Sequence, residues 1–482
     1  MLDIKGGLTS NTEKTIERLF AAGKKPEDIQ NIRKEFNNRD RSIRESQVGK
    51  TQKDKDVGTG EKRRTVVAVR IAINFAKKIC RVATAFEVGK PVTLIPSETN
   101  KLSQLIKLLW KTNRIDSILV RFVFQKKSET QAALQFYIAD VKPDGLFMKI
   151  ISFVGAKLGI SSQNKETKIA LLENKNGVMA PYFDETGDMK AFSWKYASKS
   201  DDDKDLENVM VWDDLTVYKL DNSTGKLTMS EGYPKLHGFD RIPIVYDDQD
   251  EPEWFDALDP VDRYETIISK LGGSNDRTAY PLMKLYGELG SFPEADDNGK
   301  ILQFPIKVDE DSGKEIHGDA EFMTNPNGPD SIKLELETLE KAIYGITSTP
   351  DLSFDNVKGL GAVSGIALKL MFLDAMIKAS MNEGDNRTVV ERIINIMMSG
   401  ITKTTNTSLV VESKNLYYDI VFNSILPDDL KELVETMSSA KEAGLVATKT
   451  AVERLGLNED TEEEMKLIAA ETVIKNPDPI TA

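Results

Sequence analysis

The sequence is poor in the residues that most often carry out chemistry. It has one cysteine, Cys80, which excludes an internal disulfide and any metal site built from several cysteines. Two histidines, His237 and His317, lie eighty residues apart, so a nucleophilic triad could use only one of them. We expect both to be ordinary loop or strand residues. Carboxylates are so abundant that none stands out as catalytic without knowledge of geometry.

Long apolar runs are also missing. No stretch approaches the ~18 uninterrupted apolar residues of a membrane helix. The start, Met1-Leu2-Asp3-Ile4-Lys5, is not followed by an apolar signal segment. We therefore expect a protein that is made and used in a cytoplasm and does not bind a membrane. With 482 residues, of which 40% are apolar and 29% charged, the chain can form about two to four packed domains.

Positive charge is scarce after the first hundred residues. The net charge is −13, and residues 1–100 carry 21 Lys and Arg against 13 Asp and Glu. Residues 201–260 carry only 5 against 17. A protein that grips nucleic acid tightly usually has a strongly basic domain. Either nucleic acid is not a partner, or the protein contacts it without holding it.

Apolar spacing divides the chain into helical and strand-rich parts. Residues 128–250 are predicted to be rich in strands, with a hairpin turn at 222–225 and an edge strand or bulge around Pro243. Gly272-Gly273 is expected to interrupt or end a helix that starts near Pro260. Two strand-like runs, 301–308 and 315–323, follow it. Helices are predicted at 65–86, 101–110, 115–123, 330–343, from Ser364 toward Met398, and at 427–443, 448–455 and 461–471.

Motifs for cofactor chemistry are not found. The segment Gly359-Leu360-Gly361-Ala362-Val363-Ser364-Gly365 has glycine spacing one residue longer than a dinucleotide-binding loop, and no strand precedes it. The run Asp201-Asp202-Asp203-Lys204-Asp205 is expected to be an exposed acidic loop. Neither a metalloprotease helix motif nor a paired-cysteine or serine-hydrolase motif is present. We therefore expect no cofactor and no metal, and a structural or binding role.

The order of elements and five local segments resemble the portal proteins of long-tailed bacteriophages. The resemblance covers about residues 60–470 and depends on the ordered set, not on any one motif. An aromatic pair common in the family is absent near residues 35–38, and the 279–328 insert is assigned by order alone. The five segments are Phe86-Glu87-Val88-Gly89-Lys90-Pro91, His237 to Val245, Ile346 to Ser353, Ser364-Gly365-Ile366-Ala367-Leu368-Lys369, and Tyr418 to Pro427.

The resemblance implies an α+β portal fold with an α/β wing, a two-helix stem, a small α/β clip, a long crossing helix and an α-helical crown. An N-terminal helical and mobile segment over 1–60 would precede the wing. The implied divisions are the wing at 61–258, stem helices at 259–278 and 329–346, the clip at 279–328, a tunnel loop at 347–363, the crossing helix at 364–401, a wing strand at 402–426 and the crown at 427–482.

The tunnel loop is the candidate site of contact with DNA. The resemblance places it at the narrowest part of a channel, where one lysine per subunit would form a ring of positive charge weak enough to release the duplex. The implied channel residues are Asp351, Phe354, Asp355, Asn356, Lys358 and Leu360. The implied hinge and helix-start residues are Gly359, Gly361, Ser364 and Gly365. The alternative is an ordinary surface loop before a helix.

The implied function is a homo-oligomeric ring, commonly of twelve subunits, at one vertex of the virion capsid. Double-stranded DNA would pass through it during packaging and ejection. Its implied partners are the terminase, the head–tail connector, the scaffold and the major capsid protein, with assembly in the host cytoplasm. Three alternatives remain open at this point: another virion subunit such as a connector or capsid protein, a metal-dependent nuclease that uses carboxylates, and a generic DNA-binding module, which the acidic charge disfavours.

Overall fold

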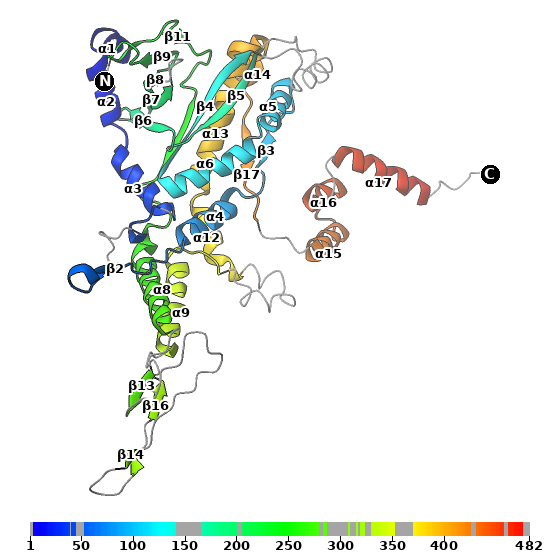
Figure 1. The fold of residues 1–482 in the computed structure, drawn as a ribbon. Helices are drawn as coiled ribbons and strands as arrows, with labels where there is room; N and C mark the ends of the chain where they lie inside the picture. The colour runs from blue at the N-terminus through cyan, green and yellow to red at the C-terminus, as the bar shows by residue number, and fades with distance from the viewer. Residues whose placement is uncertain are drawn as a thin grey trace.

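The chain forms an elongated subunit that combines helices and sheets (Figure 1). Two antiparallel sheets and several helices lie at one end, a pair of long helices forms the middle, and short strand pairs lie at the other end. A separate group of helices follows at the C-terminus. The computed structural model describes residues 3–38, 40–44, 53–140, 165–199, 205–278, 283–286, 307–308, 315–316, 319–322, 329–351, 370–425, 430–456 and 461–475.

The larger sheet is antiparallel and is covered by the first helices. Its order is β10-β9-β8-β7-β6, and β11 also pairs with β9. Leu19 of α2 is fully buried in a cluster with Val209 and Leu220 of the sheet. The predicted hairpin is confirmed, because Thr228 pairs with Asp221. The strands are β6 Gly177–Phe183, β7 Met189–Lys199, β8 Asp205–Trp212, β9 Thr216–Asp221, β10 Thr228–Met229 and β11 Lys235–Leu236, and the helices are α1 Ile4–Ser10, α2 Thr12–Ala21 and α3 Pro26–Phe36.

The second sheet has the order β12-β4-β5 and packs beneath the largest apolar core. Pro243 immediately precedes β12, which is an edge strand, as the internal proline predicted. Its carbonyl oxygen accepts a hydrogen bond of 2.8 Å from the backbone N–H of Phe136. Helices α5 and α6 contribute Leu102, Leu119 and other residues to the core. The bounds are β4 Gln131–Asp140, β5 Lys165–Leu172, β12 Ile244–Asp248, α5 Lys101–Thr112 and α6 Ile115–Glu129.

The helix predicted over residues 65–86 is wrong in its first half. Residues Arg64–Val66 form strand β2, paired with β1 (Lys55–Val57), and α4 begins only at Phe75 and runs to Val88. The intervening segment is held against α8 (Leu258–Thr278) by side chains of that helix. The backbone N–H of Ile71 donates to Ser269 Oγ at 2.9 Å. The apolar residues here pack on another helix in a non-helical conformation, so their spacing was misleading.

The same contact explains why two glycines do not end α8, contrary to the prediction. The helix continues through Gly272 and Gly273 to Thr278. A Cβ atom added at Gly272 would lie only 3.2 Å from Val69 Cγ1. The glycine therefore provides room for the neighbouring segment to approach the helix closely.

A long helical pair forms the middle of the subunit. Helix α9 spans Pro329–Ile346 and packs beside α8, and the Arg263 side chain of α8 approaches Glu335 Oε1 of α9 at 2.6 Å. Both helices were predicted. Beyond them lie two short antiparallel pairs, of which β13 was not predicted. The pairs are β13 Met283–Tyr286 with β16 Asp319–Phe322, and β14 Lys307–Val308 with β15 Glu315–Ile316.

The predicted long helix toward Met398 is divided in the described residues. Helix α12 covers Leu373–Met381, α13 covers Glu383–Gly400, and Asn382 lies between them. The Asn382 amide donates to Glu87 of α4 at 2.7 Å, so a side-chain contact with another helix occupies the break. The predicted start at Ser364 lies outside the described residues.

After α13 the chain adds one more strand to the body and then forms a group of three helices. Strand β17 (Tyr418–Val421) pairs with β3 (Thr93–Pro96) of the body. The last three helices contact each other and lie apart from the body in Figure 1. They are α15 Leu430–Glu442, α16 Thr448–Leu455 and α17 Thr461–Lys475. Shorter elements are the 3-10 helices at Ser42–Arg44, Gly60–Lys62, Phe255–Ala257 (η3) and Thr407–Leu409, the π-helix at Ile401–Thr405 and α14 Val410–Ser413.

Candidate functional site

The residues predicted to meet DNA fall almost entirely outside the described part of the chain. Asp351 is described, at the end of the segment that follows α9. Its carboxylate lies 3.9 Å from Lys78 Nζ of α4. The others that lie outside the described residues are Phe354, Asp355, Asn356, Lys358, Gly359, Leu360, Gly361, Ser364 and Gly365. The structure therefore describes residues 347–351 of the predicted tunnel loop. The next described residue is 370, in the predicted crossing helix.

The chain leaves α9 through a tight hydrogen-bonded turn. The Thr347 hydroxyl donates to the carbonyl oxygen of Ile343 at 2.8 Å, and the backbone N–H of Thr349 donates to the carbonyl oxygen of Tyr344 at 2.9 Å. Ser348 has a positive φ of 50°, which ends the helical path. Thr347 and Thr349 are both buried. The entry into the predicted loop is therefore fixed in position.

One lysine connects the start of the predicted loop to helix α12. Lys378 of α12 donates from Nζ to the carbonyl oxygen of Thr347 at 2.7 Å. The same ammonium group forms an ion pair with Glu253, which lies just before η3. Thr347, at the start of the predicted loop, and α12 are thus joined through a single side chain.

Behind Lys378 lies a buried network of charges. Lys127 at the end of α6 is 2% exposed, and its Nζ lies 2.7 Å from Glu87 Oε1 and 2.9 Å from Glu253 Oε2. The Glu87 carboxylate also accepts hydrogen bonds from the amides of Asn382, at 2.7 Å, and Asn386, at 3.0 Å. We call Glu87, Lys127, Glu253 and Lys378 the hub. It connects α4, α6, α12 and the segment before α8 at one point.

The hub is electrostatically balanced. Burial opposes the charged form of Lys127, but the carboxylates of Glu87 and Glu253 outweigh it and raise the pKa of the ammonium group. Burial also opposes ionisation of Glu253, and Lys127 and Lys378 outweigh it and lower the pKa of that carboxyl. Cys80 lies nearby, and burial raises the pKa of its thiol far above neutrality. We therefore expect Lys127 and Glu253 to stay charged at neutral pH and Cys80 to be unreactive.

A second buried pair fixes α8 to the N-terminal region. Arg41 is 3% exposed and its guanidinium approaches Glu265 Oε1 at 2.6 Å and Asp262 Oδ1 at 3.3 Å. Glu265 Oε1 also accepts a hydrogen bond of 2.7 Å from the backbone N–H of Ile73. Burial raises the pKa of Glu265 to about 7, although Arg41 acts in the opposite direction.

The raised pKa of Glu265 predicts that stability depends on pH. A carboxyl whose pKa is higher in the folded state contributes stability at pH values below its unfolded pKa, near 4.5, and this contribution is lost as pH rises through about 7. Glu265→Gln should abolish this loss. The unfolding free energy of the wild type should fall by about 2 kcal/mol more than that of the variant when the pH rises from 5 to 8.

Urea unfolding at several pH values measures this difference. Glu231→Gln is the control, because it replaces an exposed carboxylate in the connection between β10 and β11. Its unfolding free energy should change with pH as that of the wild type does. A Glu265→Gln variant whose pH profile parallels that of the wild type would show that Glu265 does not titrate in this range.

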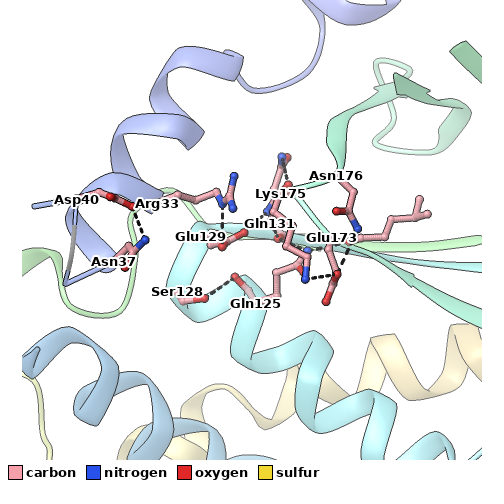
Figure 2. Close-up of polar contacts among 12 residues, drawn as sticks. Arg33, Asn37, Asp40, Gln125, Ser128, Glu129, Gln131, Glu173, Lys175 and Asn176 are labelled. Atoms are coloured by element: carbon pink, nitrogen blue, oxygen red, sulfur yellow. Dashed lines mark hydrogen bonds and ion pairs between the residues drawn. The ribbon is translucent and has the colours of Figure 1, made fainter. Parts of the chain in front are cut away.

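A polar cluster joins α3 to the end of α6 and the residues after β5 (Figure 2). Arg33 Nε lies 3.2 Å from Glu129 Oε1. The Asn174 amide donates to Glu129 Oε2 at 3.0 Å. Gln131, which is buried, donates from Nε2 to Asn174 Oδ1 at 3.0 Å. These contacts cross from the N-terminal helices to the second sheet, so they fix α3 in place on the body.

The other residues considered in the sequence analysis are the two histidines and the acidic run near residue 201. His237 Nδ1 accepts a hydrogen bond of 3.2 Å from the backbone N–H of Phe239, and burial lowers the pKa of the imidazole. His317 and residues 201–204 lie outside the described residues. Among the residues that are described, no group of three or more His, Cys, Asp or Glu side chains could hold a metal ion. No helix in the described ranges is long and apolar enough to cross a membrane.

One protein family matches the chain over most of its length. Residues 24–475 match the family model described as phage portal protein, SPP1 Gp6-like. The chain belongs to this family of phage portal proteins. It is thus a structural, non-enzymatic component of the virion that serves as the portal at the capsid vertex and assembles into an oligomeric ring. This confirms the resemblance seen in the sequence and decides against the capsid-subunit and nuclease alternatives.

Solved structures from phage-like particles are similar to this portal subunit. One is a chain of the "neck of empty GTA particle computed with C6 symmetry", with a TM-score of 0.42 and 10% identity over 80% of this chain and 89% of that chain. Another comes from the "virion of native gene transfer agent (GTA) particle", with a TM-score of 0.38 and 11% identity over 80% and 88% of the two chains. No match was found among curated protein sequences.

Proposed function

We propose that the chain forms a ring of twelve subunits whose central channel conducts double-stranded DNA during packaging and ejection. The hub carries this proposal, because it joins Thr347, the first residue of the predicted tunnel loop, to α12, the helix described after that loop. In this arrangement the loop at 347–363 faces the channel and the α8–α9 pair is the stem. The net charge of −13 supports sliding, because an acidic lumen repels the duplex and few lysines are available to trap it.

The other parts of the subunit receive matching roles in this proposal. Residues 61–258 form the wing, and 279–328 form the clip, which docks the terminase and later the head–tail connector. The crossing helix begins at Ser364, residues 402–426 return to the wing, and 427–482 form the crown. The distal position of β13–β16 beyond the stem supports the clip assignment (Figure 1). The ring would assemble in the host cytoplasm with the scaffold and the major capsid protein.

The mass of the purified protein in solution tests the proposal. We expect light scattering to give a particle of about twelve times the 53.8 kDa subunit mass, and negative-stain images of the same peak to show a central hole. The family's ring architecture is the reason for this expectation. A compact dimer without a hole would contradict the proposal.

A further inference from the structure

A closed ring of more than two subunits needs two different surfaces on each subunit. Each copy must present one surface to the neighbour on one side and a complementary surface to the neighbour on the other. The two surfaces should match in apolar shape and be opposite in charge. Two surfaces in the described part of this chain have these properties.

The first surface is an apolar stripe along α12 and the turn of helix before it. Leu370, Leu373, Ile377 and Met381 are 64%, 45%, 50% and 80% exposed, and their spacing places them on one helix face. The opposite face of the helix carries the buried Ala375 and packs on α4. Four large apolar side chains exposed in a row mark a surface that another molecule covers.

An acidic groove of about 450 Å³ adjoins this stripe. Ile377 and Met381 belong to both the stripe and the groove. Its exposed carboxylates are Glu251, Asp256 and Asp374. None of the three forms an ion pair with another residue that the structure describes. We call the stripe and this groove together the acidic face.

The second surface is a groove of about 550 Å³ between α4 and α6, which we call the basic face. Its floor is apolar, and its rim carries four exposed cations, two of which, Arg121 and Lys175, pair with Glu173 of the same groove. Within the described ranges, Lys77 and Arg81 form no ion pair, and they lie one helical turn apart on the same side of α4. The floor includes Phe36, Val120, Phe124 and Leu171, and the rim cations are Lys77, Arg81, Arg121 and Lys175.

The two faces lie on different sides of the subunit. Helix α4 contacts α6 beside the basic face, and it also contacts the buried side of α12, whose stripe points away from it. In Figure 1, α4 and α6 cross in front of α12 and α13. Two complementary faces separated by the body of the subunit are the arrangement that a head-to-tail ring requires.

We propose that the acidic face of one subunit docks into the basic face of the next copy around the ring. The α12 stripe would cover the apolar floor, and Glu251, Asp256 and Asp374 would meet Lys77 and Arg81. The proposal rests on the ring function above and names the surfaces that close it. It also places the subunit contact next to the hub, so that the base of each tunnel loop adjoins a neighbouring subunit.

Charge reversal on both faces tests this contact. We expect Lys77→Glu with Arg81→Glu to raise the concentration needed for half-maximal ring assembly by roughly tenfold or more, and Asp256→Lys with Asp374→Lys to do the same, because like charges then oppose each other across the contact. The fourfold variant restores opposite charges and should recover rings at close to the wild-type concentration. This recovery would also show that the substituted chains fold.

Light scattering and negative-stain images measure assembly. The matched control is Lys14→Glu with Arg18→Glu, which reverses two exposed cations one turn apart on α2, outside both faces. It should assemble as the wild type does. Rings that are unaffected by either double reversal, or a fourfold variant that assembles no better than the double variants, would overturn the proposed contact and leave the portal function intact. A wild-type chain that forms compact dimers would instead contradict the proposed ring.

Discussion

Lys127→Met is expected to lower the free energy of unfolding by about 3–5 kcal/mol, one of the largest effects available to a single substitution in this subunit. The methionine fills a similar volume but leaves Glu87 without its buried cation and Glu253 with only Lys378. A buried carboxylate without a partner is far more costly than an exposed one. Urea unfolding followed by tryptophan fluorescence measures the loss. Lys111→Met, at an exposed lysine of α5, is the control and should change the free energy by less than about 0.5 kcal/mol.

A second substitution separates charge from packing in the hub. Adding Glu87→Gln to Lys127→Met removes the stranded carboxylate, while Glu253 keeps its ion pair with Lys378. The single carbonyl oxygen of the glutamine can still accept a hydrogen bond from one of the two amides, those of Asn382 and Asn386, which bond different oxygens of Glu87. We therefore expect the double variant to be more stable than Lys127→Met alone. If the double variant is less stable, the hub stabilises the fold by packing and not by charge balance.

The sequence predicted the framework of the subunit because its apolar spacing is set by local burial. Apolar spacing identified helices α8 and α9, in which Val261, Ile267 and Ile343 are buried. The proline before β12 correctly predicted an edge strand. Patterns of this kind depend on residues close in sequence, so they can be read without a structure.

The errors arose where distant segments determine the conformation. Residues 67–74 have helical spacing but bind α8 through Glu265 and Ser269, which lie almost two hundred residues later. The hub was missed for the same reason. A lysine near the end of a helix usually indicates a solvent-exposed position, and nothing local shows that Lys127 meets Glu87 and Glu253. Sequence reasoning therefore could not show the buried charges that join Thr347 to α12.

Lys358→Glu tests the proposed channel role of the loop. We expect ring assembly to be unchanged, because Lys358 belongs to neither the acidic face nor the basic face. The amount of packaged DNA should fall by roughly tenfold or more, because a ring of lysines at the constriction becomes a ring of carboxylates that repels the phosphates in an enclosed space. The measurement is DNA protected from nuclease in particles assembled with each variant.

The control for this experiment must change charge by the same amount elsewhere. Lys226→Glu lies in the exposed turn between β9 and β10 and should package DNA as the wild type does. Lys358→Gln separates the two parts of the effect: it removes the attraction without adding repulsion, so its packaging should lie between those of the wild type and Lys358→Glu. Packaging that is normal in Lys358→Glu would remove this side chain from the channel wall. A ring that fails to form would instead mean that the loop holds the subunits together, and the contact between neighbours would then extend from the acidic and basic faces into the loop itself.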